Sequence, residues 1–111
     1  MNSAEKKRME EDRERNQLVQ SACSFLRAVD SGTRPDADPK AIELARTIYD
    51  ASNRMFDATD HLFEIHDDVS LGKRSEEELQ ETWDRVVDTQ GETAAAIDTA
   101  AEKLAQLTDQ A

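Results

Sequence analysis

Acidic, histidine and cysteine side chains are the residues of this chain that could do chemistry, and one group of them has ligand spacing. Asp57, His61 and Glu64 are spaced i, i+4 and i+7, so they share one face of a helix. Three such ligands could bind a divalent metal ion weakly. The same face is rich in other acids, however, and solvation of a charged surface explains it without a metal. We therefore expect no metal site there.

The remaining candidates are isolated. His66 lies on the apolar side of the same stretch, where it could make a pH-sensitive interface contact or reach solvent at the end of a bundle. Cys23 has the surroundings of a small buried hydrophobe rather than of a reactive thiol. The sequence has no nucleophile–base set, phosphate loop or Cys/His zinc spacing, and its apolar stripes hold no acids for a di-metal site. These observations predict a non-enzymatic protein without a cofactor.

The element that carries most of these residues is a long amphipathic helix, predicted over residues 39–71. Its apolar residues fall on four adjacent heptad lines that span roughly 160° of the surface, and the other lines are mostly acidic. Asp38 is a good N-cap, Pro39 suits the first turn, and Gly72 suits the C-terminal cap. The helix would be on the order of 45 Å long, with an apolar face wide enough for two partners.

A second long helix is predicted over residues 76–109. Ser75 and Glu78 match a capping box at its start. A line of mostly apolar residues, with Gln90 and Thr93 in its middle, then runs at spacings of four and three from Leu79 through Trp83 to Leu107. This unbroken pattern is typical of coiled-coil-like packing with a slight left-handed supercoil.

The N-terminal part of the chain divides into two segments of different character. Residues 17–31 have a short apolar stripe that runs from Leu18 to Val29 and should end at Gly32. Residues 1–16 are predicted to form a charged helical arm with almost no apolar face, either solvated or ordered by a partner. We expect this arm to contribute little to folding.

Together these elements predict a single all-α domain over residues 1–111, an up-down-up three-helix bundle built on a long antiparallel hairpin. The short second loop sets a register in which facing residue numbers of the two long helices sum to about 146, so Phe63 lies level with Trp83. For the first and second helices the expected sum is about 70, which places Ala22 opposite Ile48 and Leu18 opposite Ser52.

The apolar stripes of the three predicted helices differ in length. The first helix can cover only half of the hairpin, and the other half has only the charged arm beside it. An apolar patch of that size should be covered by a second copy or by another protein. The predicted interface comprises Met55, Phe56, Leu62, Phe63, His66, Leu79, Trp83 and Val87, and the neighbouring acidic face comprises Asp50, Asp57, Asp60, Glu64 and Asp67.

Composition limits the possible partners. The net charge of −11 argues against direct binding of nucleic acid or an anionic membrane. The single cysteine and the charged N-terminal sequence, which does not match a signal peptide, predict a cytoplasmic protein. The favoured function is that of a helical interaction module, a small adaptor or inhibitor that self-associates, with a dimer favoured. The alternatives are an acidic nucleic-acid mimic that blocks a basic protein, and a structural oligomer building block.

Overall fold

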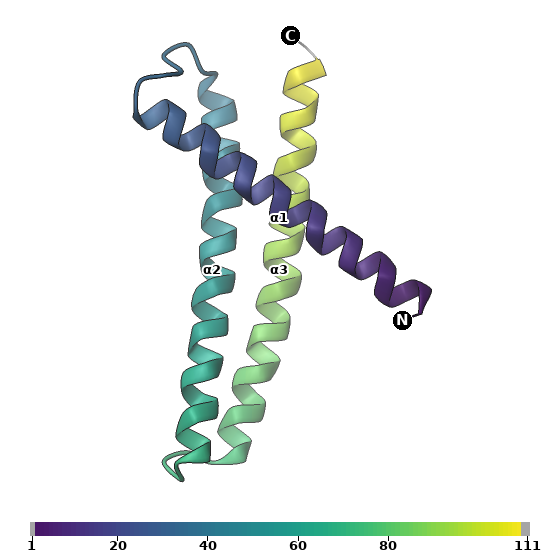
Figure 1. The fold of residues 1–111 in the computed structure, drawn as a ribbon, viewed down its shortest axis with the longest axis vertical. Helices are drawn as coiled ribbons and strands as arrows, with labels where there is room; N and C mark the ends of the chain where they lie inside the picture. Colours follow the sequence, from purple (N-terminus) through teal and green to yellow (C-terminus); the bar gives the residue numbers. More distant parts are fainter. Residues whose placement is uncertain (1, 110–111) are drawn as a thin grey trace.

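The computed structural model describes residues 2–109 and shows three α-helices (Figure 1). They are α1 (Ser3–Asp30), α2 (Pro39–Ser70) and α3 (Glu76–Asp109). α2 and α3 form an antiparallel hairpin and α1 crosses one of its faces, which gives a molecule 56 Å long and 18 Å thick. The described residues form no strand, so the predicted all-α three-helix bundle is confirmed. None of the described helices is both long and apolar enough to cross a bilayer.

The ends of the helices follow from their cap residues. The Asp38 carboxylate accepts a hydrogen bond of 2.8 Å from the Lys40 N–H, and the Ser75 hydroxyl accepts one of 3.2 Å from the Glu78 N–H. Gly32 and Gly72 follow α1 and α2 with φ values of 79° and 73°, a conformation that strains residues with a Cβ. These boundaries lie within one residue of the predicted ones.

The register of the hairpin agrees with the prediction. Arg54 Nη2 donates to Glu92 Oε2 at 3.0 Å, and the numbers of these two residues sum to 146. Phe63 and Trp83 line one hollow between α2 and α3, as that register requires. The short loop after α2 therefore fixes which residues of the two long helices are neighbours.

The charged arm and the first apolar segment form one continuous helix rather than two segments. α1 begins at Ser3, where the Asn2 side chain accepts from the Glu5 N–H at 2.8 Å and the Glu5 carboxylate accepts from the Asn2 N–H at 3.3 Å. This capping box satisfies two groups at the helix start. The sequence signal of this cap is Asn followed three residues later by Glu.

α1 crosses the hairpin obliquely instead of running parallel to α2 (Figure 1). Ala22 packs in one cluster with Ile48, as expected, and Leu18 also lies beside Asp98 of α3. Because α1 crosses the hairpin at an angle, a single register with α2 cannot extend along its whole length. Small side chains at the crossing let a short apolar stripe settle over the groove between the other two helices. The buried residues there are Ala22, Ala45, Ile48, Ala51, Ile97 and Ala100.

The N-terminal half of α1 projects past α3 and away from the body of the hairpin (Figure 1). Met9 in this half is 51 % exposed. The arm therefore borders the half of the hairpin near the second loop only at the hollow that Arg8 and Asp12 line with Phe56 and Val87, and it does not run along that half as the sequence predicted. Because its charged side chains have no apolar area to bury, solvent is the favourable environment for it.

Candidate protein-interaction surface

The half of the hairpin near the second loop has a narrow core of its own. Leu62 and Ile65 of α2 and Val86 of α3 are buried in the seam between the two helices. Thr82 is also buried, and its hydroxyl donates to the Glu78 carbonyl oxygen at 2.9 Å, so burial leaves no unpaired polar group. This seam holds the two helices together without a third helix above it.

Large apolar side chains lie beside that seam in solvent. Phe56 is 65 % exposed, Phe63 62 %, Trp83 53 % and Val87 50 %. We call these four residues, with half-buried Met55 and Leu79 and exposed His66, the tip patch. Trp83 belongs to the regular four-three stripe of the sequence, yet Thr82 occupies the inner position and Trp83 the outer one. In this half α3 packs against α2 alone. Contact with a single helix buries fewer residues than the apolar stripe of α3 contains, so some of them stay exposed.

Two hollows connect the members of the tip patch. The first lies near the second loop and is lined by Phe63, His66, Leu79 and Trp83, with Leu62 among the residues beneath. The second is a wedge between α1 and the hairpin, where Phe56 and Val87 meet the Arg15 side of α1. Because Phe56 and Phe63 are seven residues apart, they lie on one line of α2. The patch is thus on the hairpin face that α1 crosses, and it continues from beneath α1 toward the loop.

Seven of the eight residues expected at an interface are exposed or half-buried in the structure, and they lie on one half of the hairpin. Leu62, the eighth, is 8 % exposed and forms part of the floor of the patch. The five acids of the predicted acidic face, Asp50, Asp57, Asp60, Glu64 and Asp67, are all exposed.

Asp57, His61 and Glu64, the group with metal-ligand spacing, are all exposed on α2. His61 Nδ1 lies 4.0 Å from Glu64 Oε2, and both side chains are more than half exposed. Among residues 2–109, no three histidine, cysteine or acidic side chains come close enough to hold a metal ion. Cys23 is half-buried beside Tyr49 and Leu26.

An ion pair that sequence reasoning missed links α1 to α3 of the hairpin. Arg15 donates to both carboxylate oxygens of Asp98, at 3.0 and 2.9 Å. This hydrogen bonding raises the pKa of Arg15 above its ordinary value, so the guanidinium stays charged. The two residues are 83 positions apart, and neither differs by type from the many other charged residues, so no local signal could have paired them.

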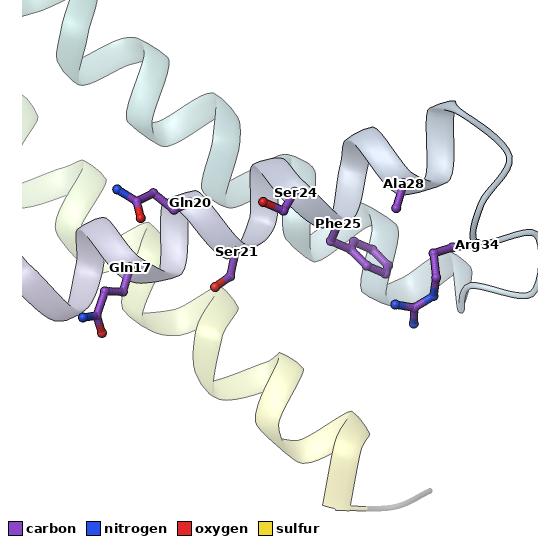
Figure 2. Close-up of a pocket in the computed structure, with 7 residues that line it drawn as sticks. All are labelled: Gln17, Gln20, Ser21, Ser24, Phe25, Ala28 and Arg34. Atoms are coloured by element: carbon purple, nitrogen blue, oxygen red, sulfur yellow. The ribbon is translucent and has the colours of Figure 1, made fainter.

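A further depression runs along the outer face of α1 and has a different character. Its lining is mostly small and polar, with Gln17, Ser21 and Ser24 from α1 (Figure 2). At one end the Arg34 guanidinium lies 5.5 Å from the centre of the Phe25 ring, a cation–π contact that ties the first loop to α1. This open, polar surface offers little to bury, in contrast to the tip patch.

Comparison with known proteins gives no relative from which a function could be transferred. No family model, curated protein or solved structure matches the chain.

Proposed function

We propose that the protein is a non-enzymatic interaction module that binds another protein through the tip patch. The observation that carries this proposal is the exposure of Phe56, Phe63 and Trp83, each more than half in solvent on one half of the hairpin. The chain has only five aromatic residues, so three of them lie where they contribute little to its own core. Aromatic anchors of this kind dominate the binding energy of protein interfaces.

In the free protein these exposed side chains lack the stabilisation that burial would give them. Full burial of a large apolar side chain stabilises by about 1.5–3 kcal/mol relative to leaving it exposed. Several such side chains together can supply the roughly 8 kcal/mol that corresponds to a micromolar complex, after the costs of association are met. A cytoplasmic location belongs to the same proposal and is supported by the single free cysteine, because a reducing compartment keeps thiols unpaired.

The proposal is tested by comparing the proteins that three forms of the chain retain from a native lysate. The forms are the wild-type protein, Phe63→Glu and the control Asp50→Asn, which alters an exposed acid outside the patch. We expect the wild-type protein and the control to retain the same proteins and Phe63→Glu to lose them. Circular dichroism should show equal helix content in all three. If the three forms retain identical proteins, the tip patch is not the binding surface.

Self-association through the same patch, which the unequal stripe lengths predict, stays a prediction. Light scattering after gel filtration at several concentrations measures it directly. A dimer that Phe63→Glu converts to a helical monomer would establish self-association, and a wild-type monomer at tens of micromolar would exclude it as a strong interaction.

A further inference from the structure

We propose that the partner of the tip patch is an amphipathic helix with basic residues along its flanks, which lies on the hairpin face beside α1. This inference rests on the proposed function and adds the chemistry of the partner. An apolar groove between two helices is a common receptor for the apolar face of a third. The choice of a basic partner comes from the charges around the groove.

The negative charge of the protein is concentrated where the apolar patch is exposed. Residues 55–90 contain eleven acids and three bases, a net charge of −8 out of −11 for the whole chain. The negative electrostatic potential of this region attracts a basic partner and speeds its association.

The rim of the tip patch is acidic on both helices. Asp60 and Asp67 are at i−3 and i+4 from Phe63, so they are its direct neighbours on the surface of α2. On α3, Glu76 lines the hollow that holds Trp83, and Asp84 is at i−3 from Val87. All four rim acids are exposed.

Two of the arginines near the patch, Arg54 and Arg74, already have other partners. Arg54 pairs with Glu92 at 3.0 Å, and Arg74 pairs with Asp68 and Glu78 at 3.0 and 3.3 Å. Among the described residues, no lysine or arginine forms an ion pair with any of the four rim acids. Asp67 lies 3.9 Å from His66, and Asp84 accepts a hydrogen bond of 3.0 Å from the Gln80 amide, but neither contact supplies a lysine or arginine, so the rim keeps its negative charge for a basic ligand.

α1 shows how this hairpin face holds a helix. Its apolar side packs on the hairpin core while Arg15, at its edge, pairs with Asp98 of α3 at 2.9 Å. Asp84 lies two heptads before Asp98, so it has nearly the same direction on α3 nearer the loop. A partner helix with its apolar side on Phe63 and Trp83 and a base near Asp84 would repeat the arrangement of α1.

A second copy of the chain fits this site less well than a basic helix does. Face-to-face pairing of two tips would bring two regions of net charge −8 into contact, at distances shorter than the roughly 8 Å over which physiological salt screens charges. The three bases in residues 55–90 are too few to balance the acids that such a dimer would bring together. A basic helix removes the repulsion and buries the same apolar side chains.

The chain contains a suitable reporter for the test, because Trp83 is its only tryptophan and belongs to the patch. The probes are three synthetic peptides of about 18 residues without tryptophan, a length of about 27 Å as a helix. One has leucines on one face and lysines and arginines on its flanks. The second has the same leucines with glutamates on its flanks, and the third is a scrambled form of the basic peptide with no apolar face. Titration of the full chain with each peptide follows the emission of Trp83.

We expect the basic amphipathic peptide to shift Trp83 emission to the blue and to bind at least tenfold more tightly than either control peptide. Its affinity should fall as salt is added. Asn substitutions at Asp60, Asp67 and Asp84 together should weaken this binding tenfold or more while the Trp83 shift at saturation remains. Phe63→Glu should weaken it too, although it adds a negative charge.

The other outcomes separate the two proposals. Equal binding of the basic and acidic amphipathic peptides would overturn the basic partner and leave the interaction module standing. Equal binding of the scrambled peptide, or tighter binding by Phe63→Glu, would show attraction by charge alone and overturn the helix. No binding of any peptide by a protein that light scattering shows to be a monomer would count against both proposals. A wild-type dimer with buried Trp83 would make a second copy the occupant and overturn the basic helix alone.

Discussion

The two halves of the α2–α3 hairpin share one register but differ in what covers them. In the half beneath α1, Ala45, Ile48 and Ala100 are at most 2 % exposed, in a core built by three helices. In the half near the second loop, Leu62 and Val86 are buried in a two-helix seam, and Phe63 and Trp83 beside it are in solvent. The same amphipathic pattern therefore stabilises the fold in one half and leaves a binding surface in the other.

The largest expected effect is in the covered half. Ile48 is 1 % exposed and lies at the centre of the three-helix core, so Ile48→Ala should leave a cavity. We expect it to lower the free energy of unfolding by about 2–5 kcal/mol. Urea unfolding followed by circular dichroism measures the change. A loss below about 1 kcal/mol would show that α1 does not seal this core.

An intermediate effect is expected from the arm. A chain that begins at Asn16 lacks the Arg15–Asp98 pair and a charged segment of α1 that buries little, and exposed ion pairs contribute about 0–1 kcal/mol. We expect a loss of no more than about 1 kcal/mol in the same urea experiment. A loss greater than about 2 kcal/mol would mean that the projecting arm packs on the core. Arg15→Gln in the full chain isolates the contribution of the ion pair.

The smallest effect is expected in the uncovered half. Phe63 is 62 % exposed, so Phe63→Ala should change the free energy of unfolding by no more than about 0.5 kcal/mol in the monomer. Leu62→Ala is the matched control one residue away, because Leu62 is buried and its truncation should cost about 2 kcal/mol or more. Equal losses from the two changes would contradict the division between seam and patch.

Local signals in the sequence determined the helices and the hairpin. Heptad periodicity located α2 and α3, Asp38, Gly72 and Ser75 marked their ends, and Gly32 marked the end of α1, because caps and glycine turns act through neighbours a few residues away. The short second loop then fixed the pairing of the two long helices. The apolar stripes of the two long helices are longer than that of the first helix, and this difference predicted that no other part of the chain would bury Phe56, Phe63 and Trp83.

Tertiary structure alone decided the direction of α1 and the inner positions of α3. Leu18 lies beside Asp98, and Thr82 replaces Trp83 in the seam. An apolar stripe in the sequence indicates which residues can be buried. Where the stripe is wider than the contact with one neighbouring helix, it does not determine which of its residues face that helix. The direction of α1 depends on the close approach allowed by Ala22, Ala45 and Ala100 at the crossing, with Arg15 pairing to a residue 83 positions away. The inner positions of α3 near the second loop depend on α2 being its only neighbour there. Packing between distant parts of the chain determines the direction of α1 and the inner positions of α3, and the periodicity of the sequence contains no information about that packing.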